Sequence, residues 1–236
     1  MIYKFLPILL LLLFPAEKSI VNTNPKKTEN YLATVTSSET KTENIYKLLN
    51  ANNFVVPTLE VFSKGLEGFY KLKETGRIQK NILTLIDFSL SANSKRMWII
   101  DMENYTVLYH TWVSHGRNSG EEYASKFSNK SESYQSSLGF YATGETYKGK
   151  HGLSLRLDGL EKGINDNARS RAIVIHGADY VSESFIRNNK RLGRSQGCPA
   201  LPLELTEEII KLIKEKSCLF IYHPSNFYTE NSKLIS

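Results

Sequence analysis

The first apolar pattern in the chain is helical and lies in its N-terminal third. A short stripe around Ile45 is followed, after Pro57, by apolar residues at the three- and four-residue intervals of one helix face. Gly65 and Gly68 lie inside this pattern and lower its helix propensity. We therefore predict a helical arm over residues 43–78. Its main apolar face consists of Leu59, Phe62, Leu66, Phe69 and Tyr70.

From Asn81 onward the apolar residues follow the spacing of strands. Leu155 and Leu157 alternate with polar residues, as expected for a sheet with one face toward water. Near the C-terminus, an apolar face that ends at Ile213 predicts one helix, with Thr206 as its cap. The predicted strands are Ile82–Phe88, Met97–Asp101, Thr106–Val113, Leu138–Thr143, Leu153–Leu157, Ala172–His176 and Leu219–Tyr222.

These patterns predict a mainly β fold with an N-terminal helical arm and one C-terminal helix. The composition agrees, because 41% hydrophobic and 23% charged residues are typical of a packed globular chain. A length of 236 residues suits one main domain. We place that domain at residues 79–224 and a tail at residues 225–236.

The first 16 residues are predicted to be a secretory signal peptide. Lys4 precedes an apolar run of about ten residues, which is shorter than the roughly 20 that span a bilayer. A retained membrane anchor is the alternative. Residues 17–42 are polar without a period and are predicted to be a flexible tether. We therefore expect an exported monomer in the periplasm or cell envelope, without a stable membrane span in its mature form.

The net charge narrows the possible binding partners, and the cysteine content narrows the possible disulfides. A formal net charge of +6 suits an anionic polymer or surface but selects neither. Nucleic-acid binding is not expected, because the chain is predicted to be exported and has no basic aromatic motif. Two cysteines are too few for a disulfide scaffold. Cys218 lies in an apolar run and is predicted to be a buried, inert thiol, and both thiols are expected to be free.

The densest group of unusual residues surrounds Cys198, in the segment Gly-Arg-Ser-Gln-Gly-Cys-Pro-Ala of residues 193–200. A cysteine between glycine and proline lies on a sharply constrained turn. Gly197 allows the backbone to approach a substrate closely, and neighbouring N–H groups can point at one oxygen. The turn therefore suits a nucleophile with an oxyanion hole, although a tight turn with a buried thiol is equally compatible with Gly-Cys-Pro alone.

His176 supplies the base that such a thiol needs. It ends the apolar run Ala172–Ile175 and is followed by Gly177, so it is expected at the end of a buried strand. A free thiol is mostly protonated in neutral water, and an imidazole can accept its proton. A structural histidine is the alternative interpretation, but the combination with Cys198 favours catalysis. The basic residues Arg187, Lys190, Arg191 and Arg194 lie between the two and are expected to lower the thiol pKa or bind substrate carboxylates.

The combination of His176-Gly177 with Ser195-x-Gly197-Cys198 resembles the active-site signature of the L,D-transpeptidase (YkuD-like) catalytic domain, in the branch whose motif ends in Gly-Cys-Pro-Ala. The resemblance covers roughly residues 80–224. Further similar segments are Ser114-His115-Gly116, Phe127-Ser128-Asn129, Ser136-Ser137-Leu138-Gly139-Phe140 and Leu155-Arg156-Leu157-x-Gly159-Leu160.

This resemblance implies a YkuD-like β-sandwich or barrel and acyl transfer on peptidoglycan stem peptides, which serve as donor and acceptor. It implies that Cys198 is the nucleophile and His176 its base. Gly197 and Cys198 would provide the oxyanion hole, with Ser195 and Gly177 shaping the pocket. His115 and Ser137 fall on segments that line the substrate in the family, and no cofactor or metal is implied.

Two positions depart from the family pattern. Many relatives carry histidine immediately before the Gly-Cys pair and arginine two residues after the cysteine, where this chain has Gln196 and Ala200. The residue that recognises the donor carboxylate is therefore unassigned, and Arg194 or Arg156 is the expected substitute.

The sequence favours some alternative functions and disfavours others. The five histidines show no His-Glu-x-x-His spacing, which disfavours zinc hydrolysis, and no Gly-x-Ser-x-Gly elbow indicates a serine hydrolase. The same Cys/His pair would make the protein an L,D-carboxypeptidase if water replaced the acceptor amine. A catalytically inactive cell-wall-binding protein is the non-enzymatic alternative.

Overall fold

The computed structural model describes residues 41–235, and residues 1–40 and 236 lie outside this part. The predicted signal peptide and nearly all of the predicted tether therefore fall outside the described residues. The last two tether residues, 41 and 42, belong to a helical segment that extends to residue 47. Within residues 41–235, no helix has the length and apolar character needed to cross a membrane.

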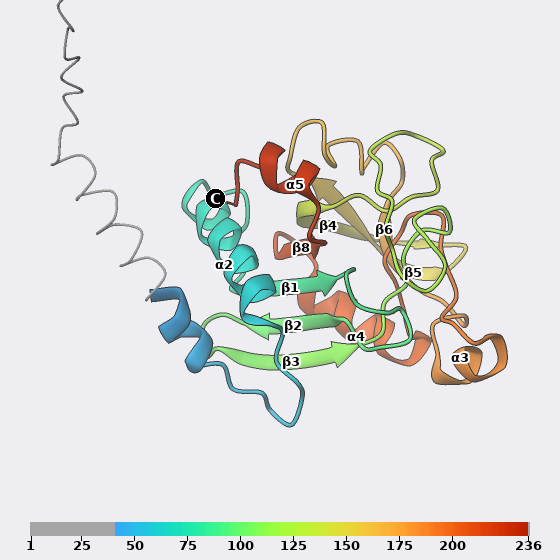
Figure 1. Cartoon of the computed structure of the whole chain (residues 1–236), viewed down its shortest axis with the longest axis horizontal. Helices are drawn as coiled ribbons and strands as arrows, with labels where there is room; N and C mark the ends of the chain where they lie inside the picture. The colour runs from blue at the N-terminus through green and yellow to red at the C-terminus, as the bar shows by residue number, and fades with distance from the viewer. Residues whose placement is uncertain (1–40, 236) are drawn as a thin grey trace, which may run out of the picture. The chain divides into compact units, whose positions relative to one another are not determined.

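An eight-stranded sheet forms the centre of the described part (Figure 1). Its strand order is β3-β2-β1-β8-β4-β5-β6-β7, and the pairs β1–β8 and β6–β7 are parallel while the others are antiparallel. The mainly β class is confirmed. The strands are β1 (Ile82–Asp87), β2 (Met97–Asp101), β3 (Thr106–Thr111), β4 (Gly139–Gly149), β5 (Gly152–Gly159), β6 (Val174–Gly177), β7 (Ala200–Leu201) and β8 (Cys218–Tyr222).

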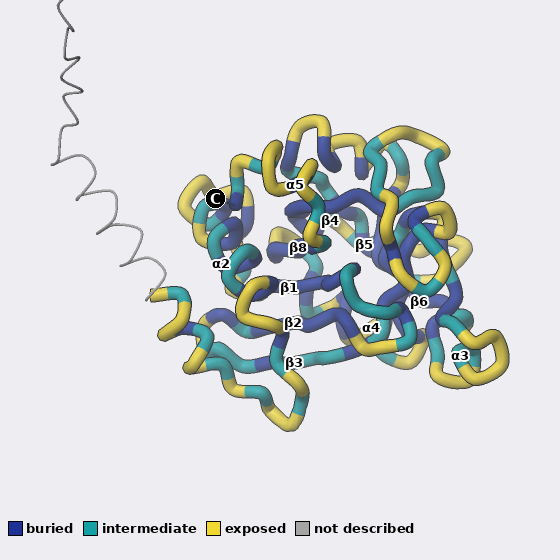
Figure 2. The backbone as a smooth tube through the Cα atoms, in the orientation of Figure 1, coloured by how far each residue is buried: buried dark blue, intermediate teal, exposed yellow. Residues whose placement is uncertain are grey.

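The two edges of this sheet meet, so that the sheet is nearly closed. After β3, the Ser114 N–H donates to the Ala200 carbonyl at 3.0 Å, and the Ala200 N–H donates to Ser114 Oγ at 3.2 Å. Strand β7 was not predicted, because two residues are too short to show a period. Figure 2 shows that the central strands are buried and that exposure is concentrated in the connections.

Helix α2 (Leu59–Glu74) packs closely on the sheet through the two glycines that had been interpreted as weakening it. A Cβ at Gly65 would lie 2.4 Å from Leu85 Cδ2, and one at Gly68 would lie 2.1 Å from Phe140 Cζ. The glycines thus remove side chains where the helix contacts β1 and β4. The Thr58 hydroxyl caps the helix by accepting from Val61 N–H at 3.4 Å.

Three shorter helices follow: one is the predicted C-terminal helix, and the other two were not predicted. Helix α4 (Leu203–Ile213) starts two residues earlier than its apolar face suggested, and Thr206 is not its cap. Pro202 occupies the cap position, and Thr206 Oγ1 donates to its carbonyl at 2.8 Å. Helix α3 (Glu183–Asn189) contains no buried residue and only seven residues, too few to show a helical period. Helix α5 (Asn226–Asn231) lies in the predicted tail.

Candidate active site

The turn that carries Cys198 is held by its own hydrogen bonds. Ser195 Oγ donates to the Cys198 carbonyl at 2.6 Å and accepts from the Gly197 N–H at 3.0 Å. Gly197 has φ +122°, and a Cβ there would lie 2.9 Å from the Gln135 carbonyl oxygen. Only glycine combines this backbone with this close approach. The thiol is therefore presented from a rigid turn.

The Cys198 sulfur lies against the start of β6. The Val174 N–H donates to Sγ at 3.5 Å, and the thiol donates to the Ala172 carbonyl at 3.7 Å. Cys198 is partly exposed. Within residues 41–235, no hydrogen bond joins Sγ to the His176 ring. The thiol proton thus rests on the backbone side of the site.

His176 lies two residues farther along β6 than Val174. In the sheet, it pairs with Ala200 of β7 on one side and with Ser154 of β5 on the other. Cys198 precedes Ala200 by two residues, so the parallel β6–β7 pair places the cysteine turn beside Val174, two residues before His176 on the same strand. This placement is what allows one site to contain both groups.

The orientation of the His176 ring is set by its neighbour in the chain. Nδ1 lies 2.9 Å from the Gly177 carbonyl, which can only accept, so the hydrogen-bond network assigns the proton to Nδ1. Nε2 is then the proton acceptor. Gly177 also lets α4 approach, because a Cβ there would lie 2.6 Å from Thr206 Oγ1.

The electrostatics of the site favour a neutral resting pair. Burial raises the pKa of the Cys198 thiol, while the Val174 N–H and the Arg171 guanidinium lower it. Burial lowers the pKa of His176, and the positive charges of His151 and Lys150 act in the same direction. Arg187, Lys190, Arg191 and Arg194 were expected to lower the pKa of the Cys198 thiol. This expectation is wrong, because the positive charge that lowers this pKa is that of Arg171.

Arg171 was missed in the sequence, although it directly precedes the predicted strand of His176. One of its terminal nitrogens donates to the Ser128 carbonyl at 2.7 Å and to Ser137 Oγ at 2.6 Å. The other donates to Ser133 Oγ at 3.1 Å and to the Gln135 carbonyl at 2.7 Å. Arg171 therefore holds the loop of residues 128–137 through hydrogen bonds, and its charge lies close enough to lower the pKa of the thiol. A charged residue at the entrance of an apolar strand was the signal available.

Tyr180 is a second missed residue beside the thiol. Its pKa is raised to about 12, mainly by burial and also by the charge of a Cys198 thiolate. Its side chain hydrogen-bonds Ser114, the residue that joins the sheet edges. Gly193 is required beneath it, because a Cβ there would lie 2.3 Å from Tyr180 Cβ.

The upstream segments of the motif form the support of the cysteine turn. Ser136 Oγ donates to the Gly197 carbonyl at 3.1 Å and accepts from the Gly116 N–H at 3.1 Å. Gly116 and Ser195 form an isolated parallel bridge. Ser137 Oγ donates to the Ser128 carbonyl at 2.8 Å and accepts from Arg171. The side chain of Ser137 is thus engaged within this support.

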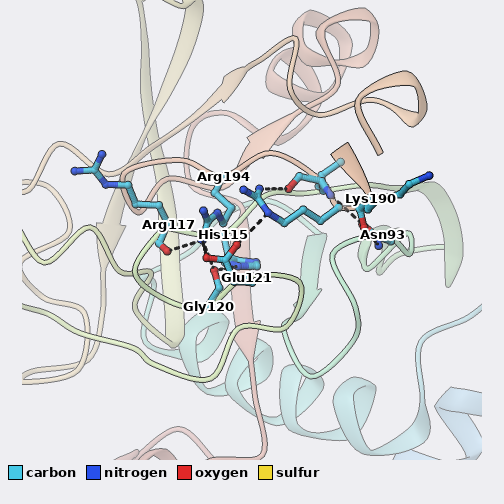
Figure 3. A network of polar contacts seen from close by, with 9 residues as sticks. Asn93, His115, Arg117, Gly120, Glu121, Lys190 and Arg194 are labelled. Carbon is cyan, nitrogen blue, oxygen red and sulfur yellow. Dashed lines mark hydrogen bonds and ion pairs between the residues drawn. The ribbon is translucent and has the colours of Figure 1, made fainter. Parts of the chain in front are cut away.

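His115 and Arg194 belong to a separate network of polar contacts (Figure 3). Arg96 donates to His115 Nδ1 at 2.8 Å, and Nε2 lies 3.2 Å from the Gly120 carbonyl, so both ring nitrogens are engaged. Burial and the charge of Arg96 lower the pKa of His115 to about 3. Arg194 donates to the Gly120 carbonyl at 2.9 Å and to Glu121 at 2.7 Å. Both side chains therefore hold the loop that follows β3.

Arg156 lies on β5, next to the strand whose Val174 contacts the thiol. It pairs in register with Val174, the residue that contacts Cys198 Sγ. Its guanidinium forms an ion pair with Glu145 at 3.0 Å and lies 4.6 Å from the centre of the Tyr147 ring. Of the two arginines proposed to recognise a carboxylate, Arg156 is the one whose register places it beside the candidate site.

The cysteines and possible metal ligands complete the description. Cys198 and Cys218 are both free thiols, and Cys218 is fully buried in β8. In the part of the chain from residue 41 to 235, no group of three or more His, Cys, Asp or Glu side chains is arranged to hold a metal ion.

Comparison with known proteins gives a family for the chain. Residues 56–222 match the model of the L,D-transpeptidase catalytic domain. The match spans α2 and the whole sheet, including Cys198 and His176. No curated protein matches the sequence.

Several solved structures are similar to this chain at low identity. An L,D-transpeptidase from Mycobacterium smegmatis has 12% identity and a TM-score of 0.37, with 61% of this chain and 59% of that one covered. The helical cell shape determining protein Pgp2 from Campylobacter jejuni has 14% identity and a TM-score of 0.41, with 69% and 57% covered. An L,D-transpeptidase from Enterococcus faecium has 14% identity and a TM-score of 0.35, with 61% and 50% covered. This chain therefore covers less than two thirds of the length of each of these proteins.

Proposed function

Because the chain belongs to the L,D-transpeptidase catalytic domain family, we propose that it is a cysteine-dependent acyltransferase acting on peptidoglycan stem peptides. The observation that carries the proposal is the placement of Cys198 on a rigid turn against β6, two residues from His176 on that strand. The His176 tautomer leaves Nε2 as a proton acceptor, which is what a base for a thiol requires.

The first step is attack by Cys198 on the donor carbonyl. Nε2 of His176 takes the thiol proton as the sulfur bonds to the carbonyl carbon of the donor stem peptide. The tetrahedral intermediate then collapses as its C–N bond breaks, and the leaving amine takes the proton from His176. The product is a thioester between Cys198 and the shortened donor.

The second step transfers the acyl group to an acceptor amine. The amine nitrogen attacks the thioester carbonyl and gives its proton to Nε2 of His176. The carbon–sulfur bond breaks, and the sulfur recovers the proton from His176. The free thiol is restored and a crosslink has formed. Water in place of the amine would release the shortened stem peptide, which is the carboxypeptidase alternative.

The oxyanion hole needs a revised assignment. The Gly197 N–H donates to Ser195 Oγ, so this group serves the turn. We therefore propose that the Cys198 N–H donates to the oxygen on which negative charge develops. Gly197 allows the backbone to approach that oxygen closely. Ser195 holds the turn, and Gly177 orients His176. Arg156 is our candidate for the donor carboxylate, in exchange for its contact with Glu145.

The cellular setting of the reaction is part of the same proposal. A peptidoglycan substrate requires the protein to work outside the cytoplasm, in agreement with the signal peptide predicted for residues 1–16. We propose a periplasmic or envelope location, a monomeric protein, and residues 79–224 as the catalytic domain, with residues 43–78 packed on it through α2.

Muropeptide mass spectrometry tests this function. The purified protein is incubated with a defined tetrapeptide donor and an acceptor stem peptide, in parallel with Cys198→Ala and the matched control Cys218→Ala. We expect crosslinked product with the wild type and with Cys218→Ala, and none with Cys198→Ala. Trimmed donor without crosslinks would establish the carboxypeptidase. Binding to sacculi without any change in muropeptides would establish the inactive wall-binding protein.

A further inference from the structure

The β4–β5 hairpin places a second histidine, His151, against His176, the proposed base. Gly149 of β4 pairs with Gly152 of β5, so Lys150 and His151 form the turn between the strands. The His151 ring stacks on the His176 ring, with 4.5 Å between the centroids and 24° between the planes. The two residues are 25 positions apart in the sequence, and only the fold brings them together.

Two features of the hairpin direct its tip toward His176. The register of β4 with β5 shifts between Thr143 and Thr146, and such a bulge bends a strand and increases its twist. Gly152 has φ +76°, a conformation that glycine adopts without strain. Ser154 of β5 pairs directly with His176. The hairpin therefore continues past this pair, and its tip is placed on the His176 ring.

We propose that His151 is a positioning residue for His176: it covers one face of the base, fixes the plane of its ring and opposes its premature protonation. This inference rests on the proposed role of His176 as the base for Cys198. The Gly177 carbonyl holds Nδ1 of His176 in place. The stacked His151 ring restricts the motion that remains, which is the tilting of the His176 ring out of its plane.

Charge supports the same role. A base that already carries a proton cannot accept one from the thiol. A positive charge on the stacked His151 ring disfavours a second one on His176 and so lowers the pKa of His176. Lys150 in the same turn adds a further positive charge that lowers the pKa of His176.

The other groups around His176 have different effects. Cys198 lies in the turn before β7, where its thiol contacts the Val174 N–H and Arg171 lowers its pKa. On β5, Ser154 does not titrate and Arg156 is paired with Glu145. From α4, the side chains nearest to this end of β6 are Thr206 and Leu203, which do not titrate. The hairpin tip is thus the element that brings positive charge to the base.

The test follows the titration of the His176 ring by NMR in the whole protein, together with the pH profile of Cys198 acylation by a carbapenem. His151→Phe keeps a stacking ring and removes the charge, whereas His151→Ala removes both. We expect the His176 pKa to rise in His151→Phe and to rise further in His151→Ala, where water also reaches the ring. The acid limb of acylation should move to higher pH by the same amounts.

Control variants separate this role from a general effect of the hairpin. Lys150→Gln should raise the His176 pKa by less than His151→Phe does, and Lys148→Gln on the same hairpin should leave the titration unchanged. An unchanged His176 titration and an unchanged acid limb in both His151 variants would overturn the inference. If the wild type forms no acyl-enzyme but the titration still moves as expected, the proposed function fails and the stacking role stands.

Discussion

In two regions of residues 41–235 a histidine, arginines and a tight loop come together, and they differ in how the histidine ring is engaged. Both ring nitrogens of His115 are engaged, one by Arg96 and one by the Gly120 carbonyl, which belongs to the network of Figure 3. At His176, the Gly177 carbonyl engages Nδ1 and leaves Nε2 as an acceptor. Residue type does not distinguish the two regions. The distinction is whether a reactive atom retains bonding capacity for a substrate.

The two thiols show the same difference. Cys218 is fully buried in β8, and burial strongly raises its pKa. Cys198 is partly exposed on a turn, and an arginine and a backbone N–H offset part of the burial effect on its pKa. One thiol is a component of the core, and the other is placed for reaction.

The largest expected effect comes from exchanging the two histidines for glutamine in turn. His176→Gln should reduce the rate of Cys198 acylation by about 10²–10⁴-fold, because general base catalysis contributes that much. His115→Gln should instead lower the free energy of unfolding by about 1–3 kcal/mol, because it disturbs buried hydrogen bonds. Acylation followed by intact-protein mass spectrometry and urea unfolding measure the two effects. A loss of acylation in folded His115→Gln that equals the loss in His176→Gln would remove the distinction between the regions.

Two arginines sharpen the same comparison. Arg96 is fully buried and donates to the Val113 and Leu90 carbonyls as well as to His115. Arg96→Met should therefore cost about 3–5 kcal/mol of stability, the range for breaking a buried charged network. Arg171→Met should cost less, because Arg171 is partly exposed, and should raise the pKa of Cys198. The pH dependence of thiol alkylation measures the second effect, and an unaltered alkylation profile would contradict it.

A smaller effect is expected from the glycine of the cysteine turn. Gly197→Ala should cost about 1–3 kcal/mol and reduce acylation, because its φ is positive and the Gln135 carbonyl is close. Gly163→Ala is the matched control, since Gly163 also has positive φ but has no heavy atom within 4 Å of the added Cβ. That variant should show only the backbone cost, about 1–2 kcal/mol, and normal acylation. Equal acylation rates in both variants would mean that the turn does not position the thiol.

The smallest expected effect is a pH dependence of stability that belongs to His115. Its pKa is lowered from 6.5 to about 3 in the folded protein, so the unfolded chain binds the proton first as the pH falls. The contribution to stability is present above pH 6.5 and is lost progressively toward pH 3. Between pH 6.5 and 5.5 the loss should be about 1 kcal/mol. Urea unfolding at the two pH values should show a loss that is smaller by this amount in His115→Gln than in the wild type, because the other buried histidines contribute equally to both.

Local sequence patterns predicted much of the fold. They did not predict the residues that surround and position the candidate site. The strands around Ile99 and Phe220 are apolar enough to be recognised, and the motifs around His176 and Cys198 indicated the pair that we propose to react. The roles of Arg171 and His151 depend on contacts between residues far apart in sequence. Gly65 and Gly68 were interpreted as weak points of a helix because the sheet beneath them is invisible to a local pattern.

The most direct test of the account is to locate the acyl group after reaction with a tetrapeptide donor. The wild-type protein is trapped at low pH, digested, and its peptides are analysed by mass spectrometry. We predict a thioester on the peptide that contains Cys198, formed with a pH dependence that is lost in His176→Gln. An acyl group on the Cys218 or Ser195 side chain, or an adduct of equal yield in Cys198→Ala, would contradict the account.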